Sequence, residues 1–429
     1  MPIRKYQHYE SRLWTLGQGE LLLSARIFQG IAVLAAFTLP ACSTGATSSQ
    51  LPGTSGGTGA AATTSSERTP QSSRAFAANC SSTAAVVEVG NCTNFELAGT
   101  ALGPTAAAAQ IPGLHPADIQ SAYRLPSTTA GSGQTIGIVV AGSDPNLASD
   151  LAVYRTAFGL PACTTANGCL TQVIGVNTVA PGVNWAHEVS IDVDMASAAC
   201  PLCKLVVVEV PTNQAADLIA GVNGAIKHGA TVVSNSYAIP ESPKELSSYW
   251  SHPGVPMVAA AGDHGYGTVN WPAAATNSIA VGATTLVASA GTARGWSETA
   301  WAGTASGCST IAAKPAWQTD KGCSMRTVAD VAVVGDPQTP VAVYDSFMDN
   351  GWIQMGGTSV STPIVAGAIA LAGNGAKLIG ASSLYANANG LFGVASGSNG
   401  TCTQSYLCTA GGGYNGPAGV GTPNGIAAL

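Results

Sequence analysis

A serine and three acidic residues stand where they could act together on an acyl group. Ser359 lies in the stretch GGTSVSTPIVAG (356–367), in which two glycines permit a sharp loop before the hydroxyl. A serine hydroxyl becomes a nucleophile only when a nearby base removes its proton. The alternative is that Ser359 merely caps a helix over Thr362 to Ala372, with Pro363 in the first turn.

Two carboxylates could supply that base. Glu188 and Asp192 are four residues apart in a helix expected over 185–200, so they share a face, which continues with apolar residues. Two acids side by side in a half-buried place cannot easily both ionise, and such a pair can serve as a general base beside a hydroxyl. The alternative is an exposed acid pair on a solvated surface. Asp194, on the opposite face, is expected to be solvated.

The third acid is Asp263, which ends the hydrophobic run VPMVAAAGD (255–263) before a glycine-rich loop. In parallel sheets the ligand site lies at the carboxyl ends of the strands. Asp263 therefore occupies a position typical of a site, although an aspartate beside glycine is also common in ordinary turns.

The elements that must position these residues alternate between apolar strands and helices. Strands are expected at 134–142, 170–176, 204–210, 231–237, 255–263, 278–284 and 330–336. Helices are expected at 147–159, 185–200 and 213–229, with another between the strands at 231–237 and 255–263. Nearly continuous apolar strands alternating with helices predict an α/β fold whose parallel sheet is covered on both faces.

Composition narrows the function class. The 429 residues include 46% hydrophobic and only 9% charged side chains, and the net charge is −6. No basic block is present, so the sequence does not favour nucleic acid as a partner.

The N-terminal part divides into three segments. Residues 1–42 are expected to be a signal peptide, in which LPAC resembles a lipoprotein cleavage box with Cys42 as the lipidated residue; plain secretion is the alternative. Residues 43–75 are rich in Ser, Thr, Gly and Ala and predict a flexible tether. Residues 76–112 form a short stapled segment, either the remnant of a pro-segment or unrelated to one. We expect an exported protein, lipid-anchored at a bacterial membrane or secreted.

Eleven cysteines are present, and ten remain when Cys42 is set aside. An even number in an exported chain predicts disulfides. The expected sequence-local pairs are Cys80–Cys92, Cys163–Cys169, Cys200–Cys203, Cys308–Cys323 and Cys402–Cys408. The CPLC pair at 200–203 could instead be a redox or half-zinc motif, but a local clip is the preferred interpretation.

Three motifs in order, EVSID, GDHG and GGTSVSTP, resemble those of the sedolisins, the serine-carboxyl peptidases. HPADIQSAYRLP (115–126), VVSNSY and the C-terminal LCTAGGGYNGPAGVGTPNG extend the resemblance over about 113–429. The resemblance implies a subtilisin-like three-layer fold with a mostly parallel seven-stranded central sheet. It also implies a peptidase domain at 113–429 that hydrolyses polypeptides in acid, as a monomer.

Carried over by motif, the resemblance makes Ser359 the nucleophile, Glu188 the general base and Asp192 the residue that orients the base. Asp263 matches the acid of the oxyanion hole, where it must stay protonated to donate a hydrogen bond. The substrate-binding strand corresponds to Ser234, Asn235, Ser236 and Tyr237.

The sequence departs from the family at its calcium position. Gly393 and Asn415 stand where the family has aspartates, and carbonyls of Val394, Gly411 and Gly413 are what remains. Because calcium affinity follows ligand charge, we expect weak calcium binding at most and no required cofactor.

Two other functions stay open. One is a catalytically inactive, surface-anchored pseudoprotease that binds a peptide or partner. The other is a subtilisin-like peptidase that uses His187 as its base, although the strand IGIVVAGSD has no aspartate at its tip.

Overall fold

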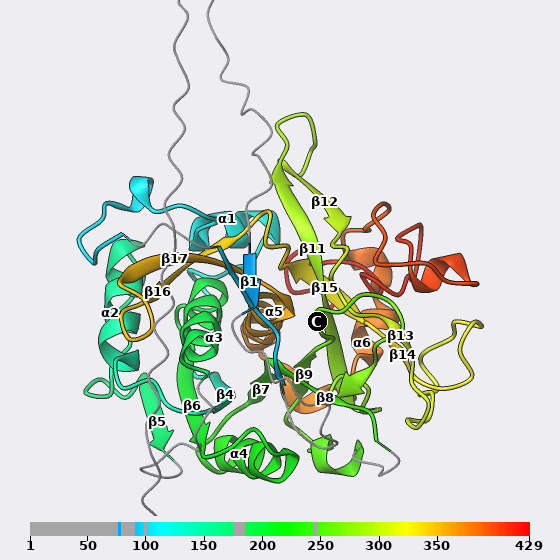
Figure 1. Cartoon of the computed structure of the whole chain (residues 1–429), viewed down its shortest axis with the longest axis horizontal. Coiled ribbons are helices and arrows are strands. Elements are labelled where there is room, and N and C mark those ends of the chain that lie inside the picture. Colours follow the sequence, from blue (N-terminus) through cyan, green and yellow to red (C-terminus); the bar gives the residue numbers. More distant parts are fainter. Residues whose placement is uncertain (1–75, 79–90, 98–101, 175–184, 243–246) are drawn as a thin grey trace, which may run out of the picture. The chain divides into compact units, whose positions relative to one another are not determined.

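A computed structural model describes residues 76–78, 91–97, 102–174, 185–242 and 247–429 (Figure 1). The expected signal peptide with Cys42, the tether at 43–75 and Cys80 lie outside the described residues. Among the described residues, no helix is both long and apolar enough to cross a membrane.

The central sheet has eight strands, one more than predicted. Their order is β12 (Trp296–Ala300), β11 (Ser278–Ala288), β9 (Met257–Ala260), β7 (Val232–Asn235), β4 (Thr135–Ala141), β6 (Lys204–Val210) and β5 (Leu170–Ile174), and β15 (Val331–Val334) also pairs with β11. Every pairing is parallel except that of β11 with β12. The predicted fold class, α/β with a mostly parallel central sheet, is therefore confirmed.

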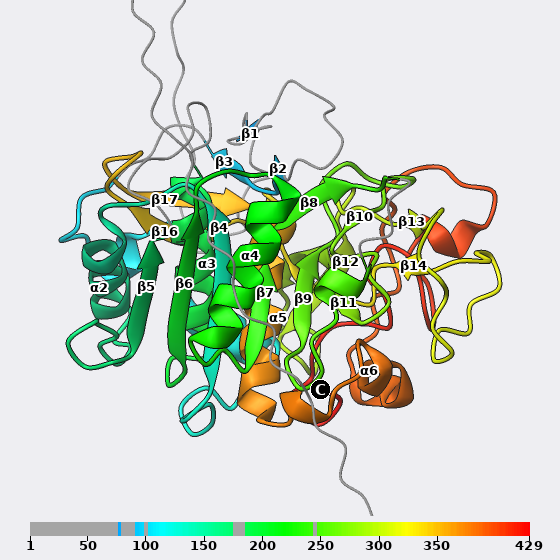
Figure 2. The same ribbon diagram turned by 90° about the horizontal axis from the view of Figure 1, so that it is seen from below.

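Helices cover both faces of this sheet. They are α1 (Pro116–Ala122), α2 (Leu147–Ala157), α3 (Ala186–Ala199), α4 (Ala215–Lys227), α5 (Thr358–Ala372) and α6 (Ser382–Ala386). Side chains alternate along β4: Ile136 and Ile138 join the core cluster that contains α3 and α5, whereas Val139 joins the cluster that contains α4. Figure 2 shows α4 in front of the strands and α5 behind them. The result is a three-layer α/β arrangement.

Smaller elements surround these layers. The remaining strands are β1 (Phe76–Ala78), β2 (Asn91–Cys92), β3 (Phe95–Leu97), β8 (Tyr237–Pro240), β10 (Asn270–Trp271), β13 (Gly307–Cys308), β14 (Thr327–Val328), β16 (Val341–Asp345) and β17 (Gly351–Gly356). The short 3-10 helices are η1 (Ala108–Gln110), η2 (Ser247–Trp250), η3 (Gly375–Lys377), η4 (Ala388–Gly390) and η5 (Ser405–Leu407). In the predicted helix between 231–237 and 255–263, the described residues form only η2.

The packing of α3 against α5 brings the sequence motifs together. A Cβ on Gly367 of α5 would lie 2.6 Å from Cβ of Ala199, so only glycine allows the two helices to approach this closely. The helix α5 is apolar around most of its circumference and buried from Thr358 to Leu371, as expected for a helix inside the core. Pro363 lies inside α5 rather than in its first turn.

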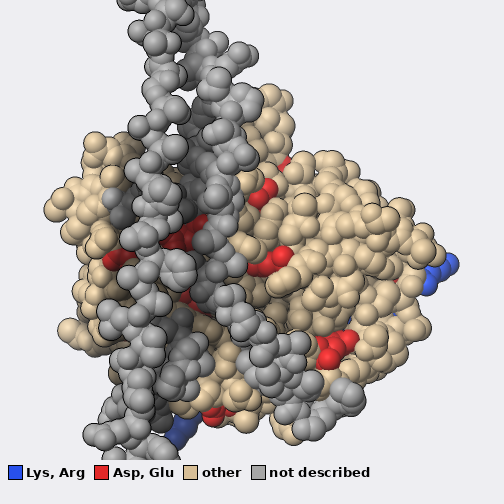
Figure 3. Space-filling view, in the orientation of Figure 1, with Lys and Arg blue, Asp and Glu red and all other residues tan. Residues whose placement is uncertain are grey.

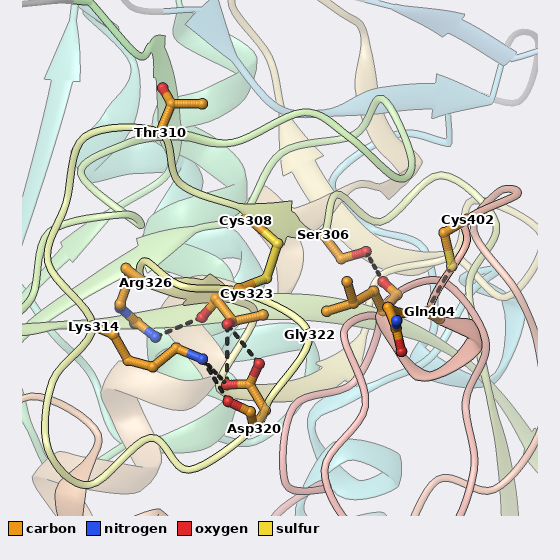
Figure 4. The surroundings of a disulfide bond; sticks show 12 residues. Ser306, Cys308, Thr310, Lys314, Asp320, Gly322, Cys323, Arg326, Cys402 and Gln404 are labelled. Atoms are coloured by element: carbon orange, nitrogen blue, oxygen red, sulfur yellow. Dashed lines mark hydrogen bonds and ion pairs between the residues drawn. A yellow bond between two sulfur atoms is a disulfide. The ribbon is translucent and has the colours of Figure 1, made fainter.

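Four of the five predicted disulfides are present: Cys163–Cys169, Cys200–Cys203, Cys308–Cys323 and Cys402–Cys408. Cys80, the predicted partner of Cys92, lies outside the described residues. Figure 4 shows the Cys308–Cys323 bond closing a loop in which Nζ of Lys314 contacts Oδ1 of Asp320 at 2.9 Å. The CPLC pair is a closed disulfide, which agrees with the clip interpretation.

Candidate active site

Ser359 lies in the first turn of α5 and does not cap the helix. The N-cap is Gly357, whose φ of 115° suits glycine, so no side chain caps this helix. Ser359 is fully buried. Its hydroxyl donates to the carbonyl oxygen of Ser236 at 3.3 Å. The helix-cap interpretation of Ser359 therefore does not account for this side chain.

Glu188 and Asp192 are also fully buried, because α3 packs against α5 along its length. The exposed-pair alternative is thus excluded. The hydroxyl of Ser236 donates to Oδ1 of Asp192 at 2.6 Å. Asp194 is buried as well and accepts a hydrogen bond from the main-chain N–H of Tyr344 at 3.0 Å, so the expectation of a solvated acid was wrong.

Burial dominates the electrostatics of the acid pair. It raises the pKa of Glu188 to about 8, and hydrogen bonding from Ser359 and Asn94 offsets part of that rise. Burial and the neighbouring Glu188 raise the pKa of Asp192 well above its ordinary value, while Ser236 lowers it in part. The charge of Glu188 thus disfavours ionisation of Asp192, and the charge of Asp263 disfavours ionisation of Glu188. A carboxylate formed at Glu188 is consequently a strong proton acceptor.

Asp263 faces the first turn of α5 from the end of β9. Its Oδ1 accepts hydrogen bonds from the N–H of Thr358 at 2.9 Å and from its hydroxyl at 2.8 Å. Burial raises the pKa of Asp263 to about 7, and these two hydrogen bonds lower it in part. Oδ2 is buried and has no hydrogen-bond partner among the described residues. Asp263 therefore keeps one oxygen available at the site.

A segment of the chain's own N-terminal part, residues 91–97, lies across these residues, and we call it the strap. Its β2 pairs antiparallel with β8, placing Cys92 opposite Tyr237. Its β3 pairs antiparallel with β17, placing Phe95 opposite Gly356. The strap is thus held in extended form by strands on both sides of Ser359.

Thr93, between β2 and β3, contacts Ser359 through its main chain and its side chain. The main-chain N–H of Ser359 donates to the carbonyl oxygen of Thr93 at 3.0 Å. The N–H of Thr93 donates to Oγ of Ser359 at 3.2 Å, and the two hydroxyls are 2.8 Å apart. Next along the strap, Nδ2 of Asn94 donates to Oε2 of Glu188 at 2.6 Å. The peptide bond between Thr93 and Asn94 therefore lies against the serine and its neighbouring carboxylate.

The subtilase family model matches residues 159–383 of this sequence, a range that contains α3, β9 and α5. The chain belongs to the subtilase family. This family is hydrolytic.

Two relatives refine the comparison. Kumamolisin of Bacillus sp. (strain MN-32) is 30% identical over 357 residues, which cover 73% of this chain and 62% of kumamolisin. The chain thus spans less than two thirds of the length of that relative. The solved structure of Pseudomonas sedolisin (serine-carboxyl proteinase), complexed with two molecules of pseudo-iodotyrostatin, is similar with a TM-score of 0.60. It is 21% identical, and the match covers 73% of this chain and 96% of that chain. The resemblance to the sedolisins and the subtilisin-like fold are confirmed.

In this subtilase the predicted substrate-binding residues divide into two groups. Ser234 and Asn235 belong to β7 inside the central sheet, and Nδ2 of Asn235 donates to the carbonyl of Val258 at 3.1 Å. Ser236 and Tyr237 follow at the carboxyl end of β7, where Ser236 contacts Ser359 and Asp192 and Tyr237 pairs with the strap.

The imidazole of His187 contacts acidic side chains. Its Nε2 lies 2.5 Å from Oδ2 of Asp349, in the loop between β16 and β17. The Ser359 hydroxyl instead hydrogen-bonds to Thr93 and Ser236, and its hydrogen bonding lowers the pKa of Glu188. This geometry does not favour the alternative in which His187 is the base.

The residues at the family's calcium position do not suit a cation. Nδ2 of Asn415 points at three carbonyl oxygens, those of Val394 at 3.3 Å, Gly411 at 3.3 Å and Gly413 at 3.4 Å. Oδ1 of Asn415 accepts from the N–H of Ala418 at 3.0 Å, which fixes the orientation of the amide. A hydrogen-bond donor therefore points at the carbonyls that would otherwise ligate a metal ion.

Sequence reasoning missed the strap as part of the site. Thr93 and Asn94 contact residues far along the chain, and no motif or local pattern predicts such contacts. In the sequence, the only indication was that both residues lie in the short segment at 76–112, which was interpreted either as the remnant of a pro-segment or as unrelated to one.

Proposed function

We propose that this subtilase is a serine-type endopeptidase that hydrolyses peptide bonds in acid by a Ser-Glu-Asp mechanism. One observation carries the proposal: an extended peptide of the chain itself lies at Ser359, with its Thr93 carbonyl bonded to the Ser359 N–H. A peptidase must hold a scissile carbonyl in this relation to its nucleophile and to a main-chain donor.

In the proposed reaction Glu188 takes the proton of the Ser359 hydroxyl as the oxygen attacks the carbonyl carbon. Asp192 shares the charge and the proton of Glu188, held in place by Ser236. The Ser359 N–H and a protonated Asp263 donate to the oxyanion, and one such donor is worth about 3–4 kcal/mol of barrier. Glu188 then gives its proton to the departing amine. Water then attacks the acyl-enzyme: Glu188 takes a proton from the water and returns it to the oxygen of Ser359, which restores the hydroxyl.

The role assigned to Asp263 sets the alkaline limit of activity, whereas Glu188, whose pKa burial raises to about 8, can act as the base at lower pH only through its ionised fraction. A carboxyl donates a hydrogen bond only while it is protonated, and burial raises the pKa of Asp263 to about 7. The group is therefore neutral below that pH and becomes an acceptor above it, where it repels the oxyanion instead of stabilising it.

We further propose that residues 76–112 act as a pro-segment and that the Thr93–Asn94 bond is the first that the site cleaves. Cleavage gives an acyl-enzyme through the Thr93 carbonyl and a new N-terminus at Asn94. Hydrolysis of that ester then leaves a carboxylate at Thr93. Part of the strap is thereby released from the cleft, which opens it to other polypeptides.

Four disulfides favour an oxidising compartment outside the cytoplasm, and we propose that the protein is exported. Lipid attachment at Cys42 and a monomeric state belong to the same proposal. Neither a cofactor nor a tightly bound calcium ion is required in it.

The test incubates the purified chain with a denatured protein from pH 3 to pH 8, beside Ser359→Ala and Glu188→Gln. Cleavage that peaks in acid and disappears in both variants supports the proposal. A folded chain that cuts nothing at any pH, including its own strap, contradicts it. That outcome favours the pseudoprotease, to which the filled cleft also lends support.

A further inference from the structure

Four side chains with metal-binding groups meet at one ring nitrogen, outside the residues assigned to the reaction. Nε2 of His187 lies 2.5 Å from Oδ2 of Asp349 and 3.9 Å from Oε2 of Glu96. It lies 4.0 Å from Oδ2 of Asp345. The ligand atoms of Glu96, His187 and Asp349 are all within 4.8 Å of one another. They come from three separate parts of the fold: β3, the first turn of α3 and the β16–β17 hairpin (Figure 2).

Asp345 points independently to a ligand at this place. Its Oδ1 accepts hydrogen bonds from the N–H groups of Phe347 and Met348, each at 2.8 Å, and so shapes the hairpin loop. Its Oδ2 faces His187, has no hydrogen-bond partner among the described residues and belongs to a side chain with no exposed surface. A buried carboxylate oxygen without a partner is costly, and a cation would satisfy it.

The charge balance of the cluster also favours a cation. Three carboxylates around one imidazole repel each other, and even a protonated His187 would leave an excess of negative charge. Acidic side chains appear at several places on the face in Figure 3, whereas Lys and Arg appear only near its margin. Among the described residues, three Lys and Arg side chains form ion pairs with other acids, namely Glu298, Asp320 and Asp330.

We propose that Glu96, His187, Asp345 and Asp349 bind one divalent transition-metal ion of the zinc and manganese class. Imidazole with carboxylates is the ligand set of such ions, whereas calcium prefers oxygen ligands alone. Ligands about 2.1 Å from a tetrahedral ion lie about 3.4 Å apart. The distances from Nε2 of His187 to the three carboxylate oxygens range from 2.5 to 4.0 Å and so lie on either side of that value.

Such an ion links the strap to the body of the enzyme. Glu96 lies two residues after Asn94, and His187 directly precedes Glu188. A metal ion held between them fixes the part of the strap that follows the Thr93–Asn94 bond. Residues 94–97 then stay attached to β17 whether or not that bond is cleaved.

The test titrates Zn²⁺ into the metal-free full chain by calorimetry, with Mn²⁺ and Ca²⁺ in parallel, and counts bound metal by elemental analysis. Ser359→Ala is the background, so that the chain stays intact and the result does not depend on the proposed peptidase activity. We expect one Zn²⁺ per chain and weaker binding of Ca²⁺. Asp345→Asn should weaken Zn²⁺ binding by about 10-fold or more, while its retained Oδ1 still accepts the loop N–H groups.

Glu96→Gln and Asp349→Asn, at partly exposed side chains, should have the same effect and carry the test if Asp345→Asn does not fold. Asp217→Asn on α4 is the matched control and should bind Zn²⁺ as the background does. Visible absorption of bound Co²⁺ that changes in His187→Gln would identify the imidazole as a ligand. Absence of Zn²⁺ binding, or binding unchanged in every cluster variant, would overturn the proposal.

Discussion

The main-chain N–H of Ser359 donates a 3.0 Å hydrogen bond to the carbonyl oxygen of Thr93, a residue from the opposite end of the described chain. The contact joins the first turn of α5 to the strap, and the Ser359 hydroxyl adds a second contact to Thr93. A carbonyl in this position has the donor that a tetrahedral intermediate needs. The relation between Ser359 and Thr93 therefore ties the proposed chemistry to one identifiable bond.

Self-cleavage at that bond is the first prediction. The purified full chain, held in acid, should yield a fragment that begins at Asn94, whereas Ser359→Ala should stay intact. Intact-mass measurement and N-terminal sequencing report the position directly. Asp217→Asn, at a side chain that accepts a hydrogen bond from Thr212 and has no role in the proposed reaction, should cleave as the unchanged chain does. If the first cut falls at another bond and is also lost in Ser359→Ala, the protein is a peptidase but Thr93–Asn94 is not the first bond that it cleaves.

The second prediction is that the protonation of Asp263 determines the pH above which activity is lost. Because burial raises its pKa to about 7, kcat/KM should fall as the pH rises through that value. Asp263→Asn keeps a donor that does not titrate, so the fall near neutral pH should disappear. Asp263→Ala removes the donor and should lower kcat by about 100- to 1000-fold. A profile of kcat/KM against pH for the three proteins tests this, and an unchanged alkaline limit in Asp263→Asn would count against the oxyanion role.

Stability should also depend on pH, with a sign opposite to that of most proteins. A carboxyl whose folded pKa lies above its unfolded value binds its proton more tightly when folded. Asp263 and Asp192 both have raised pKa values, so their contribution is fully present below about pH 4 and is lost as the pH rises through their folded values, about 7 for Asp263. The free energy of unfolding from urea titrations should therefore be larger at pH 4 than at pH 7.5. Asp263→Asn should reduce the difference, and greater stability at pH 7.5 would refute the prediction.

Much of the fold followed from local sequence. The apolar run at 204–210 became β6, and the expected strand at 134–142 became β4 (Thr135–Ala141). Short apolar runs rich in β-branched residues indicate buried strands, and this pattern can be recognised without knowing which strands lie beside them. The sheet nevertheless has one strand more than predicted, because the antiparallel β12 pairs with β11 at its edge.

The features that were not predicted from the sequence depend on tertiary contacts. A helical pattern identifies one buried face, yet α3 is covered on its other face too, where Asp194 accepts a hydrogen bond from the N–H of Tyr344 in β16. The shared face of Glu188 and Asp192 was predicted, but its burial depended on α5, whose close approach needs Gly367 beside Ala199. The strap pairs with strands more than a hundred residues away, which no local periodicity encodes.

The amide of Asn415 gives the last prediction, on calcium. The unchanged chain should bind no calcium tightly, since Nδ2 of Asn415 donates toward the carbonyls of Val394, Gly411 and Gly413. Asn415→Asp replaces that donor with a carboxylate oxygen that repels the carbonyls, so the thermal midpoint should fall in a chelator. Added calcium should restore it, because the ion pairs with both the carboxylate and the carbonyls. Asn399→Asp, which removes a buried amide bonded to the carbonyl of Thr304 at 2.6 Å, is the matched control and should not be rescued by calcium. Micromolar calcium binding by the unchanged chain, measured by calorimetry, would show instead that the amide can move aside for the ion.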